Sequence, residues 1–187
     1  MGKEKDRNYC WELLCEYTQS ESLRKHALAV EACMKYYAEK YNEDVDYWGN
    51  VGLLHDFDYE KYPDYKDHPF KGAEILRTLG FEEKFVNAVL AHAEHTGKKR
   101  ESLLEKTIFA CDEISGFLIA VVYVKPNKKI EEVDVKSVKK KLKDKAFARA
   151  VNREEIIKGS QELNLPLDEH IQNCIEALKQ AKEKLNI

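Results

Sequence analysis

The chain has 187 residues, of which 43% are hydrophobic and 35% are charged. This length suits a single domain that can fill a core while keeping a strongly charged surface, so disordered, collagen-like and multi-domain classes are excluded. The net charge is −3, from 31 basic and 34 acidic residues. Segment 136–153 alone carries +7, which leaves −10 for the remainder.

The chain shows no sign of a membrane or secreted protein. Its longest apolar run, from Phe117 to Val124, is far below the roughly 18 residues that a membrane-spanning helix requires. The charged start, Met-Gly-Lys-Glu-Lys-Asp, lacks the apolar region of a signal peptide, so we expect a cytoplasmic location and no membrane partner. The five cysteines are scattered without a CxxC pair, which argues against a disulfide framework and a thiolate zinc site.

Few glycines and prolines, and no long alternation of apolar and polar residues, predict an all-α fold. The first clear helix follows Ser20, where apolar residues recur every three or four positions up to Tyr41. A second helix runs from about Val45 to Leu54 and leads into His55-Asp56 and a polar loop. Further helices are expected over about 68–79, 85–93, 102–124, 135–142, from 152 onward, and over 167–185.

Five of the six histidines lie within the first 95 residues of the chain. Four side chains lie on or at the end of separate predicted helices, beside the buried stripe, where they can meet at one point: His26, His55, His92 and Asp112. A buried Asp112 is costly unless it is paired or bound to a metal. Imidazole with carboxylate, and no thiolate, suits iron, manganese, zinc or cobalt, so we predict a divalent-metal site with Lewis-acid chemistry.

The order His26, then His55-Asp56, then Asp112 resembles the HD-domain superfamily of metal-dependent phosphohydrolases. The segment His68-Pro69-Phe70-Lys71-Gly72 resembles the helix that follows His-Asp in the HDIG subgroup, and His92 falls where that subgroup places another histidine. The remainder is similar to a small, uncharacterised group of predicted hydrolases. The resemblance implies an HD-domain helical core over 1–125 that carries the metal site, with a C-terminal helical extension over 126–187 packed on the same domain.

The resemblance also implies hydrolysis of a phosphate ester, in a nucleotide or similar small phosphorylated molecule. A first metal would be held by His26, His55, Asp56 and Asp112, and a second by His68 and His92. The number of ions, one or two, is left open, and so is the identity of the metal among Fe, Mn, Zn, Co and Mg. Asp58 is a candidate general base or a residue that orients a ligand, and its alternative role is to cap a turn.

The chain departs from the wider pattern at two places. After His55-Asp56 the HDIG form continues Ile-Gly-Lys, whereas this chain has Phe57-Asp58-Tyr59, so a lysine that contacts substrate in some relatives has no counterpart there. No adjacent His-His pair occurs, which argues against cyclic-di-GMP cleavage of the HD-GYP type. A non-enzymatic ligand-sensing or partner-binding module therefore stays open as an alternative, and a diiron oxygenase is a third.

The basic segment 136–153 has three interpretations. It is the solvated face of an amphipathic helix, a means of capturing substrate phosphate through Arg149 or Arg153, or a nucleic-acid surface. Lys71 is a further candidate for substrate binding. Nucleic acid is not expected as a partner, because no aromatic platform or recognition-helix pattern accompanies the lysines. The oligomeric state is left open.

Overall fold

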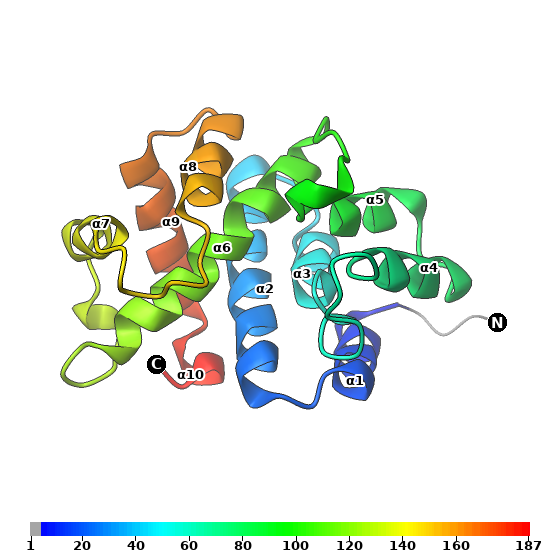
Figure 1. Ribbon diagram of the computed structural model, residues 1–187, viewed down its shortest axis with the longest axis horizontal. Helices are drawn as coiled ribbons and strands as arrows, with labels where there is room; N and C mark the ends of the chain where they lie inside the picture. Colours follow the sequence, from blue (N-terminus) through cyan, green and yellow to red (C-terminus); the bar gives the residue numbers. More distant parts are fainter. Residues whose placement is uncertain (1–4) are drawn as a thin grey trace.

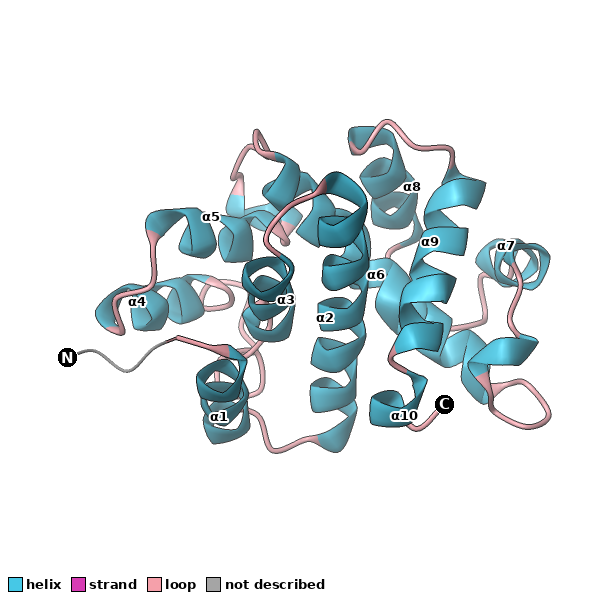
Figure 2. Cartoon of the chain, turned by 180° about the vertical axis from the view of Figure 1, so that it is seen from behind, coloured by secondary structure: helices cyan, strands magenta, loops and turns pink. Residues whose placement is uncertain are grey.

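The computed structural model describes residues 5–187, and within this range it confirms the all-α prediction, with helices, connecting loops and no strand (Figures 1 and 2). The first four residues of the charged start lie outside the described range. The helices are α1 (Arg7–Tyr17), α2 (Glu21–Tyr41), α3 (Val45–Leu54), α4 (Phe70–Thr78), α5 (Glu83–Ala91), α6 (Leu103–Tyr123), α7 (Val135–Lys143), α8 (Arg153–Glu162), α9 (Leu167–Gln180) and α10 (Lys182–Leu185), with short 3₁₀ turns η1 (Glu94–Thr96) and η2 (Ile130–Glu132).

Two long helices form the centre of the molecule. Helix α2 packs against α3, α6 and α9, and α6 also contacts α5 and α8. In Figure 1, α6 crosses α2, with α3, α4 and α5 on one side and α7, α8 and α9 on the other. The apolar stripe predicted for α2 is buried, including Ala27, Val30, Met34 and Tyr37, because it faces these neighbours. Within residues 5–187, no helix is both long enough and apolar enough to span a bilayer.

Two parts of the helix prediction differ from the structure. Helix α1 was not predicted; it starts after Asp6, whose side chain accepts a hydrogen bond from the Tyr9 N–H at 2.9 Å, and it buries Leu13 and Leu14. The helix expected over 167–185 is two helices, because the chain leaves the helical conformation at Ala181 (φ −101°, ψ 6°). Elsewhere the predicted and observed bounds differ by about two residues, which is the usual ambiguity of helix ends.

The C-terminal helices cover the face formed by α2 and α6. Helix α9 packs against both, and α8 packs against α6. The buried His170 of α9 ties the three together, since its Nε2 lies 2.9 Å from the Ala110 carbonyl oxygen of α6 and its Nδ1 lies 2.6 Å from the Tyr37 hydroxyl of α2. The division of the chain at residue 125 stays a prediction.

Candidate metal centre

The close packing of α3 on α2 brings the first two histidines together. A Cβ added at Gly52 of α3 would lie 3.0 Å from the Glu31 nitrogen and the Val30 carbonyl carbon, so the two helix backbones touch at this glycine. His55 follows one turn later, directly after the end of α3, and His26 lies one turn before Val30 on α2. Their Nε2 atoms are therefore 3.2 Å apart.

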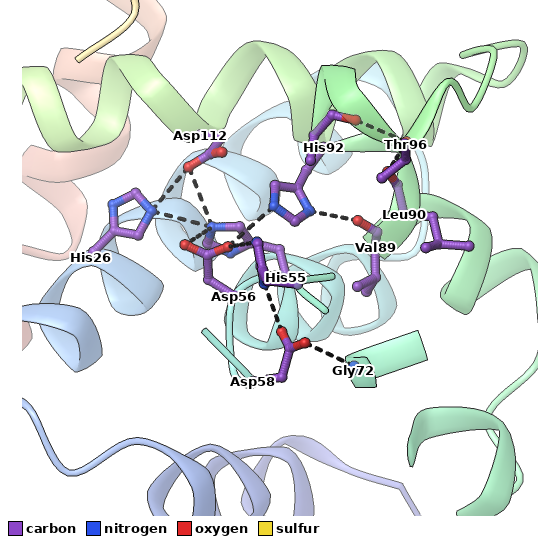
Figure 3. Close-up of polar contacts among 12 residues, drawn as sticks. His26, His55, Asp56, Asp58, Gly72, Val89, Leu90, His92, Thr96 and Asp112 are labelled. Carbon is purple, nitrogen blue, oxygen red and sulfur yellow. Dashed lines mark hydrogen bonds and ion pairs between the residues drawn. The ribbon is translucent and has the colours of Figure 1, made fainter. Parts of the chain in front are cut away.

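A carboxylate from α6 completes the first donor group. Asp112 Oδ1 lies 3.0 Å from His26 Nε2 and 3.3 Å from His55 Nε2 (Figure 3). Bonds of about 2.1 Å from one ion to its ligands place neighbouring donor atoms about 3.0 to 3.4 Å apart in octahedral or tetrahedral geometry. His26, His55 and Asp112 thus have the spacing of donors around a single divalent ion, and we call them group A.

A second donor group lies beside the first, and we call it group B. It consists of Asp56, from the loop after α3, His68, just before α4, and His92, just after α5. Asp56 Oδ1 is 3.1 Å from the Nε2 of His68 and 3.1 Å from the Nε2 of His92. The other oxygen of Asp56 faces group A and lies 3.6 Å from His55 Nε2. The Asp56 carboxylate therefore has one oxygen on each side.

Hydrogen bonds at the far ring nitrogen orient three of the four histidines. The Nδ1 atom of His55 lies 2.7 Å from the Gly52 carbonyl oxygen, and that of His92 lies 2.5 Å from the Val89 carbonyl oxygen. The Nδ1 atom of His68 lies 2.9 Å from Asp58 Oδ1. A proton held on Nδ1 by these acceptors leaves the Nε2 lone pair free to bind a metal.

Asp58 lies behind His68 and does not line the cavity. Its side chain is fully buried, and its Oδ2 accepts a hydrogen bond from the Gly72 N–H at 2.8 Å while Oδ1 faces His68. Both oxygens are thus engaged away from the ligand atoms. Of the roles considered from the sequence, this geometry suits orientation of His68 rather than proton transfer to or from a substrate.

The carboxylates of the centre shift the pKa values of its histidines. Burial alone lowers the pKa of His55, but the charges of Asp56 and Asp112 outweigh it and raise this pKa to about 9. Burial likewise lowers the pKa of His68, whereas hydrogen bonds to Asp56 and Asp58 raise it to about 10. Burial raises the pKa of Asp56 and Asp112, yet the neighbouring histidines hold both well below the usual range. The carboxylates of the centre therefore stabilise positive charge among its histidines.

A cavity of about 470 Å³ opens onto the centre, next to Asp56, His68, His92 and Asp112. Two glutamates that line the cavity, Glu113 and Glu155, were not predicted from the sequence. The available signals were that Glu113 directly follows Asp112 and that Glu155 lies in the first turn of α8. The remaining lining residues are Tyr59, Tyr65, Ala93, Glu94 and His95.

The structure does not bring the predicted phosphate-binding residues to this cavity. Lys71 pairs with Glu74 on the surface, with 3.1 Å between Nζ and Oε2. Arg153 donates hydrogen bonds to backbone carbonyl groups, including that of Val151 at 3.0 Å, and so holds the loop before α8. Arg149 is exposed on that loop. None of the three lines the cavity, and their role in substrate binding stays a prediction.

Comparisons with known proteins agree with this arrangement. A sequence model of the HD domain matches residues 23–116, half of the chain, and this range contains both donor groups. Over 100 residues the chain is 32% identical to ribonuclease Y of Geobacter sulfurreducens, a stretch that covers 52% of this chain and 18% of that protein. No solved structure matches the chain. The chain belongs to the HD domain family, whose members are in general metal-dependent phosphohydrolases.

Proposed function

We propose that the protein is a metal-dependent phosphohydrolase that acts on a small phosphorylated molecule, a nucleotide or similar phosphate ester. The observation that carries the proposal is the position of the Asp56 carboxylate, with Oδ1 3.1 Å from His68 Nε2 and Oδ2 3.6 Å from His55 Nε2. A carboxylate shared in this way by two sets of imidazole donors suits a pair of neighbouring divalent ions.

The donor set fits two such ions. Group A would hold the first and His68 and His92 of group B the second, with Asp56 between them. Imidazole and carboxylate donors suit Fe, Mn, Zn or Co, and Mg, a chemically harder ion, is the alternative. When bound, such ions lower the pKa of a bound water and polarise a phosphoryl oxygen.

The chain's own residues supply orientation. The Gly52 and Val89 carbonyl groups and the Asp58 carboxylate fix the rings of His55, His92 and His68, so the ligand atoms point at the centre before an ion arrives. The cavity of about 470 Å³ is within the usual range for small-molecule sites, roughly 300 to 1,000 Å³. This size supports a small ester as substrate. The free thiols at all five cysteines support the predicted cytoplasmic location.

The first experiment measures metal content and turnover on the same preparation. Protein purified without a metal-affinity tag is analysed by inductively coupled plasma mass spectrometry, then assayed with added Mn²⁺ against phosphate monoesters, phosphodiesters, nucleotides and a short single-stranded RNA. We expect two ions per chain and hydrolysis of a small ester. The His55→Ala/Asp56→Ala variant should lose both, whereas Asp64→Asn, an exposed carboxylate of the same loop, should lose neither.

The other outcomes have defined meanings. Full turnover in the double variant would contradict the assignment. Two ions without turnover of any ester would favour the ligand-sensing module, and bound iron with oxygen consumption would favour the oxygenase. Preferred cleavage of RNA would extend to this chain the activity that the name of ribonuclease Y states for that protein.

A further inference from the structure

The wall of the cavity is acidic in a way that the metal centre does not explain. Apart from the donor groups, its charged lining residues are Glu94, Glu113 and Glu155, and no lysine or arginine from residues 5–187 is among them. In the proposed function the metal ions meet the phosphate, and a wall of carboxylates would repel a second anionic group. The wall therefore faces some other part of the substrate.

One of the three glutamates, Glu94, already forms ion pairs with cations of the protein. Glu94 Oε1 lies 2.8 Å from Arg100 Nη2 and also pairs with Lys158. Glu113 and Glu155 have no ion pair with any lysine, arginine or histidine of the described chain. These two carboxylates are the ones that can respond to a ligand's charge.

A single residue holds both carboxylates in place. The Asn152 N–H donates to Glu113 Oε2 at 3.0 Å, and its Nδ2 donates to Glu155 Oε1 at 2.7 Å. No other hydrogen bond within residues 5–187 reaches either carboxylate, so each keeps one oxygen for a further partner. Because Asn152 also caps α8, the pair is fixed by the fold and needs little rearrangement to bind.

The two carboxylates lie close to the metal centre. Glu113 is adjacent to Asp112 on α6. Helix α8 approaches α6 so tightly that a Cβ added at Gly159 would lie 2.6 Å from Ala110 Cα, and this contact brings Glu155 to the same cavity. Both carboxylates are partly buried, and a partly buried carboxylate is stabilised by a cation beside it.

The charges of the proposed centre lead to the same conclusion. Two divalent ions with the two carboxylate ligands Asp56 and Asp112 leave two positive charges, which match a phosphate dianion. The negative charges of Glu113 and Glu155 are then not balanced by the metal ions, so they favour a positive charge on the substrate. Exposed aromatic rings stand at the same cavity, with Tyr59 41% and Tyr65 67% exposed, and aromatic faces attract ammonium groups.

We propose, building on the proposed phosphohydrolase function, that Glu113 and Glu155 select phosphate monoesters that carry an ammonium group, such as aminoalkyl phosphates. The phosphate end meets the metal centre, and the ammonium end binds the free oxygens of the two glutamates. These residues determine specificity and take no part in the bond cleavage itself.

The test compares two esters that differ only in the charged group, 3-aminopropyl phosphate and 3-hydroxypropyl phosphate, on Mn²⁺-loaded protein. We expect kcat/KM for the amino ester to be about ten- to a hundredfold higher, the range of a charge-assisted hydrogen bond. The ratio should fall towards one in Glu113→Gln/Glu155→Gln. Glu154→Gln, on the exposed face of the same helix, is the matched control and should keep the wild-type ratio.

A binding measurement separates recognition from turnover. Calorimetry with 3-aminopropylphosphonate and propylphosphonate, whose carbon–phosphorus bonds resist hydrolysis, should show the same preference in the wild type. Hydrolysis of both esters with equal kcat/KM would overturn this inference and leave the proposed function standing. Absence of hydrolysis with a retained binding preference would overturn the proposed function and leave this inference standing. If the double variant fails to fold, Glu155→Gln alone, which is remote in sequence from the metal ligands, must still lower the ratio; an unchanged ratio overturns the inference.

Discussion

The two donor groups of the metal centre are assembled in different ways. In group A, His26 and Asp112 are 86 positions apart and meet because α2 packs against both α3 and α6. In group B, all three donors come from the connections that follow α3 and α5. Group A thus depends on the packing of the whole bundle, whereas group B depends on loop conformation and on hydrogen bonds to the rings.

The rings themselves show the same difference. His68 and His92 of group B each have an Nδ1 partner and are almost fully buried. His26 of group A is 21% exposed in its side chain, and no hydrogen bond within residues 5–187 reaches its Nδ1. Its orientation is set by the ligand atoms of His55 and Asp112. Asp56 belongs to group B and turns its second oxygen to group A, so its substitution tests the comparison most directly.

The largest expected effect comes from removing the shared carboxylate. Asp56→Ala should lower metal content from two ions per chain to none and reduce turnover by about a thousandfold or more, because both groups lose a donor. His26→Ala and His92→Ala should each leave one ion, since each damages one group. Mass spectrometry of the metal content checks the three variants in parallel. If Asp56→Ala kept one ion, the shared role of Asp56 would be wrong.

The next effect is the dependence of metal affinity on pH. The raised pKa values of His55 (about 9) and His68 (about 10) mean that both rings are protonated at neutral pH without an ion, and each ion must displace a proton. Affinity should therefore rise with pH, by about tenfold per unit for each proton displaced, and level off above pH 9 to 10. Calorimetric titration with Zn²⁺ between pH 6.5 and 8.5 measures this slope, and a flat profile would exclude protonated histidines.

The same shifts set the stability of the metal-free protein. A histidine whose pKa is raised by folding contributes fully below its unfolded value of about 6.5, and this contribution is lost as the pH rises through the folded value. The Tm of the metal-free protein should fall between pH 6.5 and about 9, while that of the loaded protein should not. The gap between the two should therefore widen with pH.

The smallest effect on metal affinity is expected from substitution of Asp58, which lies behind His68 of group B. Asp58→Asn keeps the shape of the side chain but removes the charge that faces His68 Nδ1, so affinity for the second ion should fall by about tenfold while the first is unaffected. Stepwise titration of metal-free protein resolves the two affinities. Asp67→Asn, in the same loop but outside both donor groups, is the control. Equal weakening of both ions would mean that Asp58 supports the centre as a whole.

The sequence predicted most helices of the fold and the histidines and carboxylates of both groups, for identifiable reasons. Helical periodicity placed His26, His92 and Asp112 beside buried stripes, and the resemblance added His68 to the predicted ligands. Helix α1 was not predicted because its apolar residues are spread around the helix and form no clear stripe, and its stability comes from packing against α3. Tertiary packing of this kind leaves little trace in local periodicity.

The substrate side of the cavity could not be predicted in the same way. Arg149 and Arg153 are cations close in sequence to α8, yet the backbone carbonyl groups before that helix bind the Arg153 guanidinium. The residues that do face the cavity, Glu113 and Glu155, belong to helices whose contact at Gly159 and Ala110 is long-range. Charge composition gives the number of lysines and glutamates in a segment, but only the packing of α8 decides which of them reach the centre.

The position of Asn152 has a consequence for how such a protein can acquire new substrates. The candidate metal ligands all lie between residues 26 and 112, inside the matched region 23–116, whereas Asn152 and Glu155 come from a later segment. Of the two residues proposed to select the substrate, Glu113 lies in the matched region and Glu155 lies outside it, so part of the proposed substrate choice is encoded apart from the metal centre. Exchange of the segment around α8 is a route by which evolution, or a designer, could redirect the same metal centre to a different ester without touching a single ligand.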